Sequence, residues 1–117
     1  MRAARKALEL GPRVVIAKQG EYGSAMITRD GYFGLTAYPT TDIVEPTGAG
    51  DSFAGGLMGY VAGADGNTDD ATLRRAMAYG TACASFNVEG FGSERLYELD
   101  RAEIDARVAE LEAISRF

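Results

Sequence analysis

Histidine is absent from this sequence of 117 residues, and cysteine occurs once, at Cys83. The lack of histidine excludes imidazole general bases, catalytic triads that contain histidine and most zinc sites. A single cysteine excludes a disulfide within the chain, and the alanine and threonine around Cys83 predict a small buried side chain rather than a nucleophile. Any acid–base chemistry must therefore use carboxylates, lysine, tyrosine or cysteine.

Clusters of basic residues and long apolar runs are also missing. The chain has 12 Lys and Arg residues against 17 Asp and Glu residues, which gives a net charge of −5. Nucleic acids and anionic membranes attract clustered lysine and arginine, so neither is expected as a partner. No apolar run reaches membrane-spanning length, and Glu9, Gly11 and Pro12 stand where a signal peptide needs its apolar core. We therefore expect a cytoplasmic protein.

The order of the apolar segments predicts an α/β fold. A helix over residues 2–10 ends at Gly-Pro and precedes a nearly continuous apolar run over residues 13–18, which predicts a strand buried on both faces of a parallel sheet. Two further strands, over residues 24–28 and 32–38, are joined by an Asp-Gly turn, a strong hairpin signal. A helix followed by a buried strand is half of a doubly wound α/β/α fold, so the sheet of this chain is expected to be incomplete.

Three helices are predicted in the second half of the chain. They cover about residues 51–61, about residues 70–86 after a cap at Thr68 or Asp69, and a final segment whose start at residues 100–103 resembles a capping box. The interior glycines of the first of these helices cost about 1 kcal/mol each and need a steric reason, which we expect to be a neighbouring strand or a substrate. The last helix has an apolar stripe, and its charged face is expected to be solvated.

Residues 45–56 read Glu-Pro-Thr-Gly-Ala-Gly-Asp-Ser-Phe-Ala-Gly-Gly and lead from a loop into a helix. Gly48 and Gly50 let the backbone take positive φ and approach a ligand, and the helix N-terminus that follows favours an anion. Asp51 beside an anion site makes sense if the anion is a phosphoryl group in transit and the carboxylate takes a proton from the attacking hydroxyl. The plainer alternative is a glycine turn in which Asp51 complements the helix dipole.

Two common nucleotide motifs are excluded. A Walker A loop needs Gly-Lys-Ser/Thr, which occurs nowhere in the chain, and a dinucleotide fingerprint needs glycine where Phe53 stands. The stretch instead resembles the second signature of the PfkB (ribokinase-like) carbohydrate kinase family, whose usual form is Asp-Thr-Thr-Gly-Ala-Gly-Asp-Ser-Phe. Thr47 to Phe53 match this form, while Glu45 replaces the usual Asp and Pro46 replaces the commoner Thr.

The resemblance extends to two other places in the chain. Lys18-x-Gly20-x-x-Gly23 is similar to the loop that lies against the nucleotide phosphates in many relatives, and a solvated lysine at a strand end is the alternative. Asn87 and Gly90 stand in the segment that, in the family, helps to line the adenine and cation sites. An ordinary loop at the end of a helix is the alternative.

The resemblance implies an ATP-dependent phosphotransferase that moves the γ-phosphoryl group to a hydroxyl of a sugar or nucleoside. Asp51 is then the general base, a role that depends on its position beside the hydroxyl. Thr47 belongs to the nucleotide site, Mg²⁺ bridges the phosphates, and Glu45 stands near the place where family members bind K⁺. The implied anion hole consists of the backbone N–H groups of Gly48, Ala49, Gly50 and Asp51.

The similarity covers residues 1–117 as the C-terminal, nucleotide-binding and catalytic half of such a kinase domain. The N-terminal strands, the lid over the sugar and the substrate and magnesium motifs have no counterpart, so the isolated chain is expected to have little or no kinase activity. The acceptor stays open, with the loops more similar to the adenosine-kinase-like branch. Two alternatives remain: a non-catalytic nucleotide- or phosphate-binding module, and a fragment that forms homo-oligomers through the open sheet edge.

Overall fold

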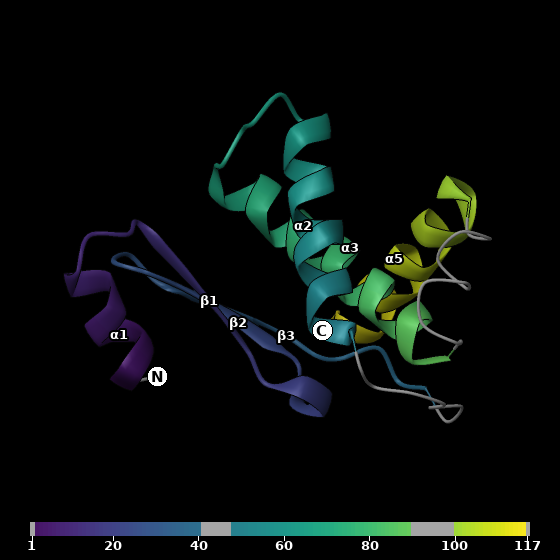
Figure 1. Cartoon of the computed structure of the whole chain (residues 1–117), viewed down its shortest axis with the longest axis horizontal. Helices are drawn as coiled ribbons and strands as arrows, with labels where there is room; N and C mark the ends of the chain where they lie inside the picture. Colours follow the sequence, from purple (N-terminus) through teal and green to yellow (C-terminus); the bar gives the residue numbers. More distant parts are fainter. Residues whose placement is uncertain (1, 41–47, 90–99, 117) are drawn as a thin grey trace. The chain divides into compact units, whose positions relative to one another are not determined.

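The computed structural model describes residues 2–40, 48–89 and 100–116 (Figure 1). The chain divides into two units, Met1–Ala37 and Tyr38–Phe117. The first unit is of the α/β type, and the second is helical. None of the helices formed by the described residues has the length and apolarity that crossing a membrane requires.

The first unit combines one helix with a three-stranded sheet. Helix α1 (Arg2–Glu9) precedes the strands β1 (Val14–Lys18), β2 (Ser24–Thr28) and β3 (Tyr32–Leu35). The strand order is β1-β2-β3, and both neighbouring pairs are antiparallel. The helix packs on the sheet through an apolar cluster that contains Ala4, Leu8, Val15, Ala17, Ala25 and Ile27.

The predicted hairpin between β2 and β3 is confirmed, although β3 is shorter than expected. The Thr28 backbone N–H donates to the Gly31 carbonyl (3.0 Å), and the Thr28 hydroxyl oxygen accepts from the Gly31 N–H (3.1 Å). These bonds close the turn and set the register of the two strands, in which Ile27 lies opposite Tyr32.

The prediction that β1 is buried on both faces of a parallel sheet is wrong. Its apolar residues, from Val14 to Ala17, are only half-buried. The strand pairs antiparallel with β2, its one partner among the described residues. The strand that is buried along most of its length is β2, which has neighbours on both sides. An apolar run alone cannot distinguish these two places in a sheet, because both favour the same β-branched side chains.

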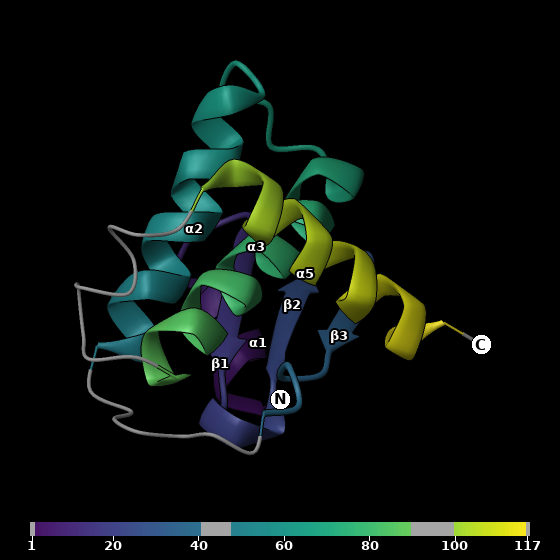
Figure 2. The ribbon, with the colours of Figure 1, turned by 90° about the vertical axis from the view of Figure 1, so that its right-hand side faces the viewer.

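The second unit contains α2 (Ala49–Gly63), α3 (Asp70–Glu89) and α5 (Arg101–Ser115). Helix α2 packs along α3, and α5 packs on α3 (Figure 2). Both α2 and α3 are longer than predicted. The prediction of a loop at Asn87 is wrong, because α3 continues to Glu89. The buried apolar side chains of these helices are Phe53, Leu57, Val61, Leu73, Ala76, Met77, Ala82, Phe86, Val108 and Leu111.

Helices α2 and α3 approach each other closely at two glycines. A Cβ atom built on Gly56 would lie 2.9 Å from the Tyr79 carbonyl oxygen, and one built on Gly80 would lie 2.7 Å from the Phe53 carbonyl oxygen. The steric reason for glycine at Gly56 is therefore a neighbouring helix rather than a strand or substrate. At Gly59 no described atom lies within 4 Å of such a Cβ, so packing of the described residues does not require glycine there.

The N-terminal caps of α3 and α5 agree with the prediction. Asp69 accepts a hydrogen bond from the Thr72 backbone N–H (2.8 Å), and Asp100 accepts one from the Glu103 backbone N–H (2.9 Å). Each bond satisfies a donor that has no partner inside its own helix. Of the two predicted caps for α3, the structure uses Asp69.

We expect the Asp69 cap to make the free energy of unfolding depend on pH in the acidic range. Hydrogen bonds with Thr72, and a weaker one with Asn67, lower the pKa of Asp69 below its ordinary value. A lowered pKa in the folded state stabilises the fold above the unfolded-state pKa, and this contribution is lost as the pH falls through the folded-state pKa. In Asp69→Asn the free energy of unfolding should therefore fall less steeply than in the parent between about pH 5 and pH 2. Urea titrations at several pH values measure both slopes, and equal slopes would contradict the prediction.

Candidate active site

The glycine turn opens directly into α2. Gly48 is the N-cap residue and adopts the left-handed conformation (φ 87°, ψ −4°) that disfavours larger residues. The first hydrogen bond within the helix runs from the Ser52 N–H to the Gly48 carbonyl (2.9 Å). Since Gly48 has no side chain, no side-chain bond caps the helix start. The backbone N–H groups of this first turn point outward along the helix axis, as an anion site requires.

Asp51 lies within this first turn, as the sequence predicts. Its side chain is exposed, and so is Gly50, whereas Ala49 is half-buried. A carboxylate and a set of outward-facing N–H groups therefore share one helical turn. Together they can accept a proton and stabilise negative charge, which are the two tasks of a transfer to a hydroxyl.

The structure brings Asn87 to the same turn. Asn87 is 4% exposed in the last turn of α3, and its amide nitrogen lies 3.5 Å from the place that a Cβ atom on Gly48 would take. A larger residue at Gly48 would meet an unfavourable φ, and its Cβ would lie at ordinary van der Waals distance from the Asn87 amide. Two residues that the sequence singles out separately thus lie beside each other.

The predicted phosphate loop of Lys18 lies in the first unit. Lys18 is exposed at the end of β1, opposite Ser24. The loop then turns through a short 3₁₀ helix, Gly20–Tyr22. Gly23, at φ 98°, has a packing reason to be glycine, because a Cβ there would overlap the Leu35 carbonyl oxygen. This packing explains Gly23 without a nucleotide.

Three predicted site residues, Glu45, Thr47 and Gly90, lie outside the described residues. Within residues 2–40, 48–89 and 100–116, no three Cys, Asp or Glu side chains are grouped so that they could hold a metal ion. The donor set at the start of α2 fits the phosphate part of a nucleotide.

Cys83 agrees with the prediction of a packing residue. It is half-buried on α3, and burial raises the pKa of its thiol, with Arg101 opposing this in part. A thiol with a raised pKa is a poor nucleophile, because the thiolate is the reactive form.

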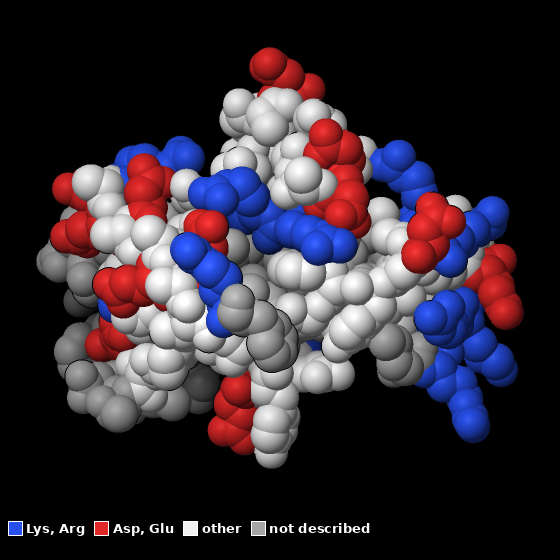
Figure 3. All heavy atoms as spheres, turned by 180° about the vertical axis from the view of Figure 1, so that it is seen from behind, with Lys and Arg blue, Asp and Glu red and all other residues white. Residues whose placement is uncertain are grey.

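Ion pairs of the second unit differ in their exposure. On the face shown in Figure 3, acidic and basic side chains are interspersed at the surface. The exposed pairs include Arg74–Asp70, Arg75–Glu112 and Arg101–Asp105. In the pair Arg107–Glu89, by contrast, the side chains are only 16% and 20% exposed. The expectation that the charged face of the last helix is solvated is therefore wrong at Arg107.

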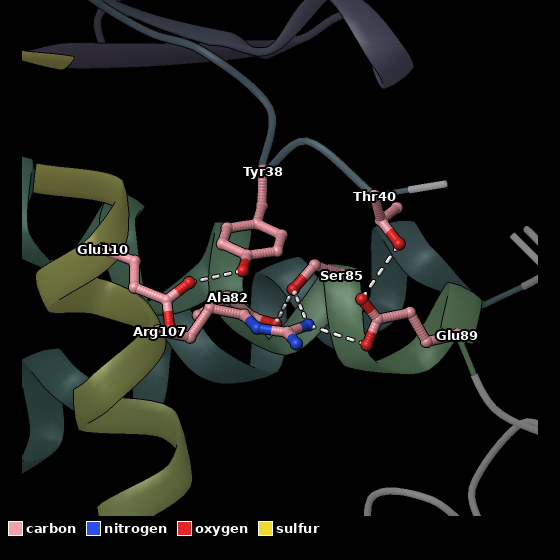
Figure 4. A network of polar contacts seen from close by, with 7 residues as sticks. All are labelled: Tyr38, Thr40, Ala82, Ser85, Glu89, Arg107 and Glu110. Atoms are coloured by element: carbon pink, nitrogen blue, oxygen red, sulfur yellow. Dashed lines mark hydrogen bonds and ion pairs between the residues drawn. The ribbon is translucent and has the colours of Figure 1, made fainter. Parts of the chain in front are cut away.

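A polar network surrounds this partly buried pair (Figure 4). Arg107 Nη1 donates to Glu89 Oε2 (2.9 Å) and to Ser85 Oγ (3.0 Å). Glu89 Oε1 accepts from the Thr40 hydroxyl (2.9 Å), and the Tyr38 hydroxyl donates to Glu110 Oε2. The sequence contains no motif for these contacts, since they join residues from three separate segments.

Comparisons by sequence relate the chain to sugar and nucleoside kinases. Residues 1–98 match the profile described as pfkB family carbohydrate kinase. A nucleoside kinase of Methanothermobacter thermautotrophicus is 39% identical over 87 residues, which are 74% of this chain and 25% of the relative. An aminoimidazole riboside kinase of Salmonella typhimurium is 36% identical over 85 residues, which are 73% of this chain and 26% of the relative.

Comparisons by structure give the same relationship. Aminoimidazole riboside kinase from Salmonella enterica, complexed with aminoimidazole riboside and an ATP analog, is similar with a TM-score of 0.76 and 31% identity, over 92% of this chain and 36% of that chain. A ribokinase from Thermotoga maritima has a TM-score of 0.74 and 30% identity, over 92% of this chain and 34% of that chain.

The chain, with its two units and its glycine turn, thus forms part of a ribokinase-like α/β fold. The chain belongs to the pfkB family of carbohydrate kinases. It spans about a quarter of the length of the relatives that it matches in sequence, 25% and 26% of the two named above.

Proposed function

We propose that the protein containing this chain is a kinase that transfers the γ-phosphoryl group of ATP to a hydroxyl of a sugar or nucleoside. The observation that carries the proposal is the start of α2, where left-handed Gly48, packed beside Asn87, opens a helical turn with an exposed Asp51. Membership of the pfkB family supports the reaction class. Relatives named for nucleosides, aminoimidazole riboside and fructoselysine support the class of acceptor.

In this proposal the Asp51 carboxylate accepts the proton of the acceptor hydroxyl as the hydroxyl oxygen attacks the γ-phosphorus. A new P–O bond forms, the bond from the γ-phosphorus to the β–γ bridging oxygen breaks, and ADP leaves. The backbone N–H groups at the start of α2 stabilise the charge on the transferring group, and loss of one such donor costs about 3–4 kcal/mol in other enzymes. Mg²⁺, when bound to the phosphates, neutralises further charge.

The other assignments belong to the same proposal. Residues 1–117 are the nucleotide-binding and catalytic part of the kinase domain. The protein is cytoplasmic. A K⁺ ion binds near Glu45. The residues assigned to the nucleotide are Lys18, Gly20, Gly23, Thr47, Asn87 and Gly90. An ATP analog in the structure of aminoimidazole riboside kinase from Salmonella enterica supports ATP as the donor.

ADP release from MgATP by the longest natural form, measured with nucleosides, aminoimidazole riboside, ribose and fructose as acceptors, tests the proposal. We expect turnover that requires one acceptor class, and little or none from the isolated 117-residue chain. Nucleotide binding without turnover on any acceptor would favour the binding module. A mass that rises with concentration, without nucleotide binding, would favour the self-associating fragment.

A further inference from the structure

Arg107 on α5 lies between groups of α3 and the chain that precedes the glycine turn (Figure 4). Besides its bonds to Glu89 and Ser85, its guanidinium carbon lies 3.7 Å from the centre of the Phe86 ring and 4.3 Å from that of the Tyr38 ring. A planar guanidinium can stack on aromatic rings while it donates hydrogen bonds, whereas a compact ammonium cannot stack in this way. The contact with the two rings therefore favours arginine over lysine.

Glu89 has the wrong charge for its place in the helix. It is the last residue of α3, where the helix dipole favours cations and disfavours carboxylates. Its two carboxylate oxygens are bonded to Arg107 and to Thr40. The pair is partly buried, so the cost of removing the two charges from water offsets much of their attraction. The pair therefore indicates a need for exact placement of this turn more than a need for stability.

The same helical turn carries Asn87, whose amide lies beside Gly48 at the candidate active site. The ends of helices fray, because their last carbonyl groups have no partner within the helix. Arg107 bonds to Ser85 and Glu89, the residues two positions before and after Asn87 in the sequence. It thereby fixes the turn from which the Asn87 amide reaches Gly48.

We infer that Arg107 and Glu89 are positioning residues for the Gly48 turn. They hold the last turn of α3 against α5, so that Asn87 keeps Gly48 and the first turn of α2 in place. Thr40, which is bonded to Glu89, is held by the same pair. Their effect on phosphoryl transfer rests on the proposed function, whereas their effect on the geometry of the turn does not.

The test is Arg107→Lys in the longest natural form, with Arg101→Lys as the matched control. Lysine keeps the charge and can donate to Ser85 and Glu89, but it has no planar guanidinium to stack on the Phe86 and Tyr38 rings. We expect kcat for transfer from MgATP to fall about ten- to a hundredfold, because misplaced donors act on the transition state. Arg101 also pairs with a carboxylate and lies over a tyrosine ring, but it is exposed, so its variant should keep the parental kcat.

Hydrogen exchange provides a measurement that does not depend on activity. In Arg107→Lys the amides of residues 52–55, the first that bond within α2, should exchange about tenfold faster than in the parent, whereas those of β2 should keep their rates. Unchanged exchange at residues 52–55 would overturn the inference, and so would a parental kcat in an active enzyme. If the parent transfers phosphate to no acceptor, the proposed function fails, and exchange alone decides whether Arg107 positions the turn.

Glu89→Gln decides the question if Arg107→Lys does not fold. Glutamine keeps the size of the side chain but loses the negative charge that pairs with Arg107. The same changes in kcat and in exchange are expected. Glu112→Gln is the control, because the pair of Glu112 with Arg75 is exposed. Parental exchange at residues 52–55 in Glu89→Gln would likewise overturn the inference.

Discussion

Asp51→Asn should lower kcat about 10²- to 10⁴-fold while MgATP binds as tightly as it does to the parent. Asparagine keeps the size of the side chain but cannot take the proton of the attacking hydroxyl. Asp51 is exposed in the first turn of α2, so the change leaves neither a cavity nor an unpaired buried group, and the fold should persist. Single-turnover transfer to the identified acceptor measures the chemical step, and equilibrium binding of MgATP measures the affinity.

Asp70→Asn is the matched control for this variant. Asp70 is also an acidic residue in the first turn of a helix, and it is exposed in its pair with Arg74. If Asp51 only complements the helix dipole, both variants should lose about 0.3–1 kcal/mol of stability and keep their turnover. Parental turnover in Asp51→Asn would remove Asp51 from the mechanism and favour a phosphate-binding module.

The start of α2 could be predicted from the sequence because its determinants are local. Gly48 permits a left-handed residue, and the small and apolar residues after it continue as a helix. The hairpin that follows Thr28 and the cap at Asp100 are likewise set by residues within three or four positions of each other. Local signals of this kind need no knowledge of the tertiary structure.

The residues that hold the Gly48 turn in place could not be predicted, because their contacts join distant parts of the chain. The sequence predicts a helix that ends at about residue 86, which places Asn87 in a loop, yet α3 continues to Glu89. Helical periodicity separates apolar from polar positions but cannot show which polar residue is buried. Only the packing of α5 on α3 reveals that Arg107 is enclosed by Phe86 and its neighbours.

Gly56→Ala should lower the free energy of unfolding by about 1–3 kcal/mol, although alanine is the better helix former. The new methyl group would lie 2.9 Å from the Tyr79 carbonyl oxygen and 3.0 Å from the Gly80 Cα atom. Both atoms belong to the backbone of α3 and cannot rotate away, so α2 and α3 must separate. Their separation would expose apolar side chains, Phe53 among them, that are buried in the parent. Urea unfolding followed by circular dichroism measures the loss.

Gly59→Ala places the same methyl group in the same helix without the contact. No described atom lies within 4 Å of it, so this variant should gain about 0.5–1 kcal/mol from helix propensity alone. If the free energy of unfolding falls in Gly56→Ala and rises in Gly59→Ala, the approach of α3, rather than helix propensity, sets the stability at Gly56. Equal gains in both variants would contradict the close packing. Because α3 also carries Asn87 to Gly48, a forced separation at Gly56 should lower kcat as well, while Gly59→Ala should keep it.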